Sequence, residues 1–373
     1  MSYNANSDLQ SFHTDRVFVD NSELTKARNR RKSNQTRLER GLTKSSDSLP
    51  LRYVPQGSYA MHTMVQSEIE TSDIDDGVVF CRDAIKGPQG GDKTSRGARE
   101  MVQRALAEDN SFKTPPEVRK NCVRVHFDDG FHLDMPVYRE YTDDDQTIKE
   151  FASGDEWKKS DPEDITNWLN QQVRDKSPDS ITGRQMRRVI RLVKYWARSR
   201  ASWTLPSGFV LSVLVDEAYR TGGWPKRDDT ALLRCMEYMY DRLLDTSVYR
   251  PVSPREEITN ERTRKHCESM RANLVQAIKR LGELETVECD ELQALQALKA
   301  VFDTNYWDTR IEKLRAEAAE SSSGQASATA STGIAVTASS IADVSLPNSS
   351  TAPTTAPVAP RLPIDKRGGG QFA

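Results

Sequence analysis

The spacing of apolar residues changes character about halfway along the chain. In the first part, short runs rich in β-branched and apolar residues predict strands at Asp73–Cys81, Asn121–Phe127 and Phe131–Tyr138. The sequence DDG at 128–130 separates the last two runs and predicts a hairpin turn. A helix is predicted between the first two strands, at Lys93–Ala107. This half of the chain therefore predicts a mixed sheet with helices.

From about Pro162 onward the apolar positions follow the period of a helix. The predicted helices span residues 162–175, 182–200, 208–220, 228–245, 256–284 and 290–318. Near the N-terminus, residues 22–41 predict another helix, with Ser22 placed to cap its start and Gly41 to end it. The fold class expected from these patterns is α+β, with a mixed lobe followed by a helical lobe.

Four segments are expected along the chain. Residues 1–21 are predicted to be a flexible N-terminus, 22–150 the α+β core with its basic N-terminal helix, 151–320 the helical lobe, and 321–373 a disordered tail. Beyond Glu320 the chain is rich in Ser, Thr, Ala and Pro, and Asp343 is the only charged residue from 321 to 360. Such a composition buries too little apolar surface to offset the entropy lost on ordering.

Composition narrows the class of protein. Lys and Arg (53) nearly balance Asp and Glu (55), so the overall charge points to no particular partner. The apolar stretches are too short to cross a bilayer, and the polar N-terminus lacks a secretory signal. The five cysteines form no CxxC or Cys/His cluster, which is typical of a reducing compartment. We therefore expect a cytoplasmic protein without a membrane segment or a structural zinc site.

One basic segment stands out against this balance. Residues 25–44 hold eight basic residues and one acidic residue, Glu39. Two interpretations stay open for this helix: a solvated cationic face, or a positive wall that meets phosphate or nucleic acid. No RNA-binding module is recognisable elsewhere, so a nucleic-acid partner is not favoured but is kept open by this helix.

The candidate chemistry begins with the sequence DID. Strand alternation places the carboxylates of Asp73 and Asp75 on one face, with Ile74 directed into the core and Asp76 away, toward solvent or a turn. Two like charges held so close favour a cation between them, and Mg²⁺ takes such oxygen ligands together with substrate phosphates. Asp134, inside a later apolar strand, is the candidate third carboxylate of a two-metal site.

A glycine–serine pair precedes these carboxylates at a predicted strand-to-helix junction. Gly57 and Ser58 offer backbone N–H groups and a hydroxyl that suit a triphosphate. In the predicted helix 182–200, four basic residues share a narrow stripe beside the apolar one: Arg187, Arg191, Lys194 and Arg198. Ser207, just before an apolar helix, is a natural N-cap.

These pieces occur in an order that resembles a known family. The segments that carry the resemblance are QGSYAMHTMV, SDIDDGVVF, HLDMPVY, EWKKSDPEDITNWL, RRVIRLVKYWAR and LPSGFVLSVLV, which together span most of residues 50–220. The chain resembles the nucleotidyltransferase fold of the DNA polymerase β superfamily and, more narrowly, the bacterial cGAS/DncV-like nucleotidyltransferases (CD-NTases). The resemblance implies a nucleotidyltransferase lobe, a C-terminal helical lobe and an active-site cleft between them.

The resemblance also implies roles for individual residues. It assigns two Mg²⁺ ions, with Mn²⁺ as the alternative metal, to Asp73, Asp75 and Asp134. It assigns contacts with the donor nucleotide to Gln56, Gly57 and Ser58. It further implies that Lys194 and Ser207 contact the triphosphate. For Arg187 and Arg198 a solvated cationic face remains the alternative.

The activity that the resemblance implies is condensation of nucleoside triphosphates into a cyclic di- or oligonucleotide, with release of pyrophosphate. Such products are second messengers in anti-phage (CBASS) signalling. Two alternatives stay open: template-independent synthesis of a linear product, as in an oligoadenylate synthetase, and a catalytically inactive nucleotide-binding scaffold. The C-terminal tail is compatible with conjugating or activating protein partners, and a passive tail is the alternative.

Overall fold

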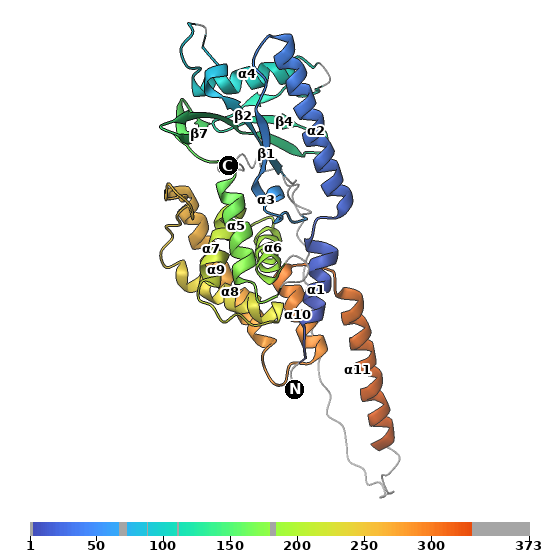
Figure 1. The fold of residues 1–373 in the computed structure, drawn as a ribbon. Helices are drawn as coiled ribbons and strands as arrows, with labels where there is room; N and C mark the ends of the chain where they lie inside the picture. The colour runs from blue at the N-terminus through green and yellow to red at the C-terminus, as the bar shows by residue number, and fades with distance from the viewer. Residues whose placement is uncertain (1–2, 67–72, 88, 110–111, 180–183, 330–373) are drawn as a thin grey trace, which may run out of the picture. The chain divides into compact units, whose positions relative to one another are not determined.

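The computed structural model describes residues 3–66, 73–87, 89–109, 112–179 and 184–329, with side chains described up to residue 320. The chain divides into one unit from Met1 to Thr309 and a second that begins at Arg310. The described part of the second unit is helical and belongs to α11 (Asp308–Thr329). The first unit holds the mixed sheet and the other helices (Figure 1).

The sheet is mixed, as predicted, because β2 lies parallel to β5 and β6 whereas the other pairings are antiparallel. Its strands are β1 (Arg52–Gln56), β2 (Asp73–Cys81), β3 (Glu117–Val118), β4 (Val123–His126), β5 (His132–Met135), β6 (Val137–Asp143), β7 (Gln146–Ser153) and β8 (Glu156–Lys159). The hairpin predicted around 128–130 joins β4 to β5 and is confirmed.

A single predicted strand, Phe131–Tyr138, is two strands in the structure. β5 pairs with the first residues of β2, and β6 pairs with its last residues. Pro136 stands between them, and proline has no N–H to donate to a ladder. Its carbonyl still accepts a hydrogen bond from Val78 N over 2.8 Å, so both strands follow β2.

Two helices cover one face of the sheet: α2 (Asn21–Lys44) and α4 (Ser95–Ala107) (Figure 1). Asp20, rather than the predicted Ser22, caps α2, because its carboxylate accepts from the N–H groups of Ser22 and Glu23. Gly41 does not end the helix. A Cβ at this position would lie 1.9 Å from Ala105 O, so glycine allows α2 to approach α4 closely.

The helical region comprises α5 (Asp164–Lys176), α6 (Gln185–Arg198), α7 (Gly208–Tyr219), α8 (Asp228–Arg242), α9 (Glu261–Glu283) and α10 (Glu291–Phe302). Each lies within a few residues of a predicted helix. The predicted helix 290–318 is interrupted after α10 by Asp303, which has a left-handed backbone (φ 50°). None of the helices among the described residues is both long enough and apolar enough to cross a membrane.

The N-terminal segment departs from the expectation of a flexible terminus over 1–21. Residues Asn6–Phe12 form α1, and His13–Val17 continue as a short π-helix. The Phe12 ring is fully buried and packs against aromatic rings from distant parts of the chain: Tyr195, Phe302, Tyr306 and Trp307. The side chain of Asn6 accepts from Asp228 N over 2.6 Å, so α1 is anchored at the start of α8.

The other expected boundaries also differ in position. The sheet continues past residue 150 through β7 and β8, and the helices begin at Asp164. The expected disordered tail began at 321, whereas α11 extends to Thr329. The remainder of that predicted tail, 330–373, lies outside the described residues.

Candidate active site

Strand β2 presents aspartates on both of its faces. Asp76 is fully buried on the face covered by α2, where Arg31 Nη2 and Gln35 Nε2 each donate to its carboxylate over 2.7 Å. The prediction that Asp76 points away from its neighbour is confirmed by this placement, but its expected role at solvent or in a turn is wrong. Asp76 instead joins the sheet to α2 through a buried ion pair.

The opposite face of β2 holds Asp73 and Asp75, and the sheet brings Asp134 to them. Asp75 is in register with Asp134 on the parallel strand β5, and Asp73 is in register with His132. Burial, the Asp134 carboxylate and the Asp73 carboxylate together raise the pKa of Asp75 to about 8. The carboxylates of Asp73 and Asp134 are therefore close enough to disfavour the charge of Asp75.

Gly57, the residue after β1, packs against Asp75 on this face of the sheet. Its backbone is left-handed (φ 62°), and a Cβ would lie 2.0 Å from Asp75 Oδ2, so only glycine fits against that carboxylate. Gly57 and Ser58 begin the short helix α3 (Gly57–Ala60). The predicted glycine–serine turn therefore lies directly beside the carboxylates.

Gln56, the residue before this turn, is in register with Asp75. Its side chain is buried, and its amide Nε2 donates to Tyr138 Oη and to Pro162 O, each over 3.1 Å. In the structure, Gln56 thus connects β1 to β6 and to the loop before α5. Its implied contact with the donor nucleotide stays a prediction.

An arginine that the sequence analysis did not single out faces Asp134. Arg124, on β4, is in register with Asp134 on β5. Its Nε donates to Asp134 Oδ1 and its Nη2 to Asp134 Oδ2, each over 2.6 Å, and both side chains are 7% exposed. A cross-strand Arg–Asp pair has no local sequence signal, because its register depends on the hairpin.

The chemistry of the carboxylates fits a divalent cation, although their present arrangement does not enclose one. Their oxygen ligands and mutual repulsion are the conditions under which Mg²⁺ binds. Across the described ranges, however, no three His, Cys, Asp or Glu side chains are placed to hold a metal ion together. The Arg124 guanidinium donates a hydrogen bond to each oxygen of Asp134. An ion that binds Asp134 would have to change this two-bond contact.

The implied phosphate residues also come together. Lys194, on α6, donates to Thr63 Oγ1 over 2.8 Å, and Thr63 N donates to Ser58 O over 2.8 Å. A Cβ on Gly208 would lie 3.2 Å from Lys194 Cε, so this lysine lies against the start of α7. The predicted N-cap of α7 is confirmed, since the Ser207 hydroxyl accepts from Val210 N. Ser58, Lys194 and Ser207 thus line one connected region.

In the basic stripe of α6, Arg191 and Lys194 are buried, whereas Arg187 and Arg198 are partly exposed. Burial and the neighbouring cations Arg198 and Arg191 lower the pKa of Lys194 well below its usual value. Arg191 donates to His62 O through Nε (3.0 Å) and Nη2 (2.6 Å), and burial lowers its pKa to about 9. Arg187 donates to Asn170 Oδ1. Within the described residues, the hydrogen bonds of these three cations go to neutral acceptors.

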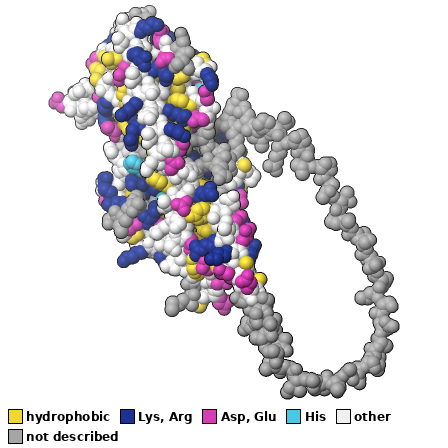
Figure 2. All heavy atoms as spheres, turned by 90° about the vertical axis from the view of Figure 1, so that its right-hand side faces the viewer, with side chains coloured by type: hydrophobic (Ala, Val, Ile, Leu, Met, Phe, Trp, Pro, Cys, Tyr) yellow, Lys and Arg dark blue, Asp and Glu magenta, His cyan; other side chains and the backbone are white. Residues whose placement is uncertain are grey.

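The basic helix α2 is different, because acidic residues meet many of its cations. Arg30 pairs with Asp129, Arg31 with Asp76, Arg37 with Asp109 and Lys44 with Glu108. On the face that Figure 2 shows, Lys and Arg side chains alternate with Asp and Glu rather than forming one continuous basic area. These pairs favour a structural role for the positive charge of α2.

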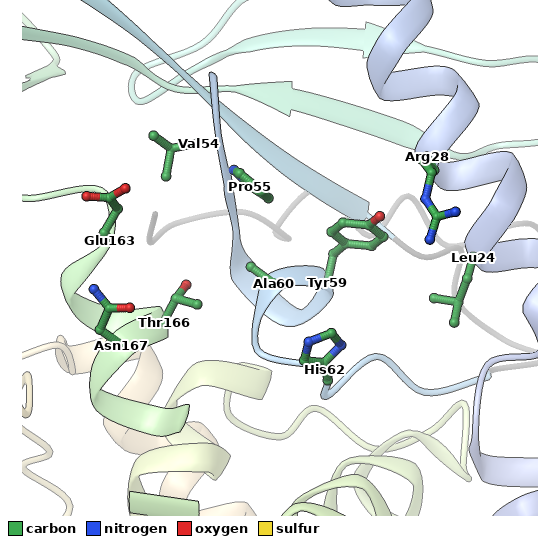
Figure 3. Close-up of a pocket in the computed structure, with 10 residues that line it drawn as sticks. All are labelled: Leu24, Arg28, Val54, Pro55, Tyr59, Ala60, His62, Glu163, Thr166 and Asn167. Atoms are coloured by element: carbon green, nitrogen blue, oxygen red, sulfur yellow. The ribbon is translucent and has the colours of Figure 1, made fainter. Parts of the chain in front are cut away.

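A cavity of about 410 Å³ lies beside α3 (Figure 3). Its walls come from α2, β1, α3 and α5 and from the segments that follow α3 and precede α5. The lining residues are Leu24, Arg28, Val54, Pro55, Tyr59, Ala60, His62, Glu163, Thr166 and Asn167. Pro55 is in register with Asp76, so it shares the α2 side of the sheet and not the Asp75 side. None of the three carboxylates is among the residues that line the cavity.

The mixed sheet, its flanking helices and the paired carboxylates beside a glycine–serine turn define a nucleotidyltransferase fold of the polymerase β type. Residues 51–138 match the family described as "Cyclic GMP-AMP synthase DncV-like, nucleotidyltransferase domain". In this region the chain is similar to the cGAS/DncV-like nucleotidyltransferases, the CD-NTase family.

Individual relatives show how far the similarity extends. A cyclic GMP-AMP synthase of Escherichia albertii is 29% identical over 151 residues, which are 39% of this chain and 31% of that protein. The alignment thus spans about a third of that relative's length. The structure of E. coli MS115-1 CdnC with ATP has a TM-score of 0.61 at 17% identity, covering 81% of this chain and 98% of CdnC. Vibrio cholerae DncV with a linear intermediate has a TM-score of 0.63 at 16% identity, covering 81% and 96%.

Proposed function

We propose that this protein condenses nucleoside triphosphates into a cyclic di- or oligonucleotide and releases pyrophosphate. The observation that carries the proposal is the meeting of Asp73, Asp75 and Asp134 on one face of the sheet, with Gly57 packed against Asp75. The family match over 51–138 includes this whole arrangement. Three neighbouring carboxylates on one face of the sheet, with a glycine–serine turn beside them, suit in-line transfer at phosphorus.

The carboxylates of Asp73, Asp75 and Asp134 would hold the divalent cations, with Mg²⁺ as the expected metal and Mn²⁺ as the alternative. When bound, these cations would neutralise phosphate charge and make a nucleotide hydroxyl easier to deprotonate. Asp75 is only partly exposed, and this partial burial strengthens electrostatic interactions at the same place.

The chain's other residues would position the donor nucleotide. Ser58 and the backbone at Gly57 lie beside the carboxylates and would contact the phosphates. Lys194 and Ser207 meet at the start of α7, where a flexible ammonium and a hydroxyl suit a triphosphate. The hydroxyl of the second nucleotide would lose its proton to solvent water on the Asp134 side, and its oxygen would attack the α-phosphorus. The bond to pyrophosphate breaks, and no covalent enzyme intermediate forms.

The cyclic product and its use rest on the relatives. One is named a cyclic GMP-AMP synthase, and another was solved with a linear dinucleotide intermediate. We propose by analogy that the product is a second messenger in anti-phage (CBASS) signalling. A structure of E. coli CdnC is a complex with HORMA-deltaN, which supports a protein partner for this chain as well. Partners acting at the C-terminal tail belong to the same proposal.

The test is to incubate the pure protein with labelled nucleoside triphosphates and Mg²⁺ or Mn²⁺. We expect a product that resists phosphatase, because a cyclic nucleotide has no terminal phosphate. The double variant Asp73→Asn with Asp75→Asn should lose at least about 10³-fold in rate, which corresponds to about 4 kcal/mol of barrier. It should unfold no more easily than the parent, because the like charges are removed. Equal rates for variant and parent would refute the assignment of these carboxylates, and a phosphatase-sensitive product would indicate linear synthesis.

A further inference from the structure

Three side chains lie in a row across three neighbouring strands. Arg124 on β4 is in register with Asp134 on β5, and Asp134 is in register with Asp75 on β2. The row therefore places one guanidinium on one side of Asp134 and a second carboxylate on the other. The carboxylate of Asp134 therefore interacts both with the positive guanidinium of Arg124 and with the negative carboxylate of Asp75.

The Arg124–Asp134 contact is a complete fork. Two parallel hydrogen bonds of 2.6 Å join Nε to Oδ1 and Nη2 to Oδ2, and each side chain is 7% exposed. Fork contacts of this kind are charge-assisted and fix the plane and direction of the carboxylate. Water competes little for so buried a pair, so the fork holds Asp134 in one orientation.

The fork also limits what else can bind Asp134. An ionised carboxylate has about four lone-pair sites, and the fork uses one on each oxygen. A divalent cation approaching the remaining sites meets the positive charge of Arg124 on the same carboxylate. Asp75 and Asp73 attract the cation from the other side, so binding is a competition between the ion and the guanidinium.

We propose that Arg124 is a positioning residue that competes with the divalent cation for Asp134. Without the ion, the guanidinium holds Asp134 in place and satisfies its charge. When the ion binds, Arg124 releases at least one of the two oxygens of Asp134. This inference rests on the proposed function only for the catalytic role of the ion. The competition between Arg124 and the ion for Asp134 concerns binding alone and does not require turnover.

Charge and geometry can be separated by two substitutions. Arg124→Gln removes the charge and the fork, whereas Arg124→Lys keeps the charge but makes a single-point contact. A nearby unit charge shifts an ionic equilibrium by about one to three powers of ten. We therefore expect Arg124→Gln to bind Mn²⁺ about tenfold more tightly than the parent, and Arg124→Lys to bind it no more tightly than the parent.

The experiment titrates Mn²⁺ into the full-length, nucleotide-free protein and follows free Mn²⁺ by electron paramagnetic resonance. This measures cation binding without turnover, and Asp134→Asn serves as the control that should weaken it. Synthesis measured alongside should show a lower kcat for Arg124→Gln, reached at a lower Mn²⁺ concentration, because Asp134 has lost its orientation. Unchanged or weaker Mn²⁺ binding by folded Arg124→Gln would overturn the proposal, as would absence of binding by parent and variant alike.

A second measurement uses the parent protein and does not depend on a variant that folds. With ¹⁵N-labelled arginine, the Nε–H resonance of Arg124 is assigned by its loss in Arg124→Lys. We expect this resonance to shift as Mg²⁺ binds, and saturation with Mg²⁺ without a shift would overturn the proposal. A parent that makes no product but binds Mn²⁺ more weakly than Arg124→Gln would contradict the proposed function while supporting the competition.

Discussion

Helices α2 and α6 both carry several Arg and Lys residues, but the groups that accept hydrogen bonds from these residues differ. On α2, cations such as Arg31 and Arg37 are paired with acidic residues from the sheet and the end of α4. On α6, Lys194 and Arg191 are more deeply buried, but within the described residues they donate to Thr63, His62 and other neutral groups. In α2 the positive charges are neutralised by acidic residues of the protein. In α6 the positive charge of these two residues is left for an anionic ligand to neutralise.

The difference indicates which helix serves the fold and which serves a ligand. A buried charge without an opposite charge costs stability, and its lowered pKa expresses that cost. An anion that binds beside α6 would remove the cost, as a triphosphate would in the proposed reaction. A paired helix such as α2 gains little from an external anion. Three measurements test this contrast.

The largest expected effect is on the paired helix. Asp76→Ala leaves the Arg31 guanidinium buried without its carboxylate, so we expect the free energy of unfolding to fall by about 3 kcal/mol or more. Urea unfolding measures it. Glu108→Ala is the matched control, because its partner Lys44 is also on α2 but the pair is exposed, and we expect a loss below about 0.5 kcal/mol. Similar losses for both variants would contradict a structural role for the buried pair.

The next effect is on Lys194 of α6 and reverses the pattern. Lys194→Met keeps the length of the side chain but removes a buried charge, so the free energy of unfolding should be unchanged or higher. Nucleotide synthesis should fall about 100-fold, or about 2.7 kcal/mol, because the triphosphate loses its ammonium. Lys44→Met, which changes an exposed side chain of α2, should leave synthesis unchanged. A destabilised but fully active Lys194→Met would show that this lysine serves the fold.

The smallest effect concerns His13, whose Nε2 lies 3.4 Å from Arg191 Nη1. Burial, then Arg191 and Arg188, lower the pKa of His13 from 6.5 to about 3. The unfolded chain therefore binds a proton that the folded chain excludes, so stability is full above pH 6.5 and is lost as the pH falls toward 3. Between pH 7.5 and 5.5 this amounts to about 1.4 kcal/mol.

The matched comparison is His13→Gln, measured by urea unfolding at both pH values. The parent should lose about 1.4 kcal/mol more than the variant between pH 7.5 and 5.5, because all other titrating groups are common to both. An equal loss in the two proteins would show that His13 accepts a proton in the folded state, and so that the α6 face tolerates further positive charge.

Local patterns predicted much of the fold. The helices from α5 to α9 begin and end within a few residues of their predicted limits, because helical periodicity is a property of neighbouring residues. The opposite directions of Asp75 and Asp76 follow from strand alternation in the same way. The predictions for Ser22 and Gly41 were wrong because the local signal was ambiguous. Asp20 competes with Ser22 as a cap, and close packing against Ala105 requires glycine as much as a helix end does.

The sequence alone determined the kinds of elements, since these depend on spacing within a short segment. It proposed the candidate residues Asp73, Asp75, Asp134 and Ser58 from the order of motifs along residues 50–220 and from the family that this order resembles. Only the tertiary structure decided which charges are paired: Arg124 with Asp134, Arg31 with Asp76, and Lys194 with Thr63. It also decided that the N-terminal segment folds, because the aromatic rings that surround Phe12 come from residues 195–307. Periodicity acts over a few residues, whereas contacts between distant segments depend on strand register and helix packing.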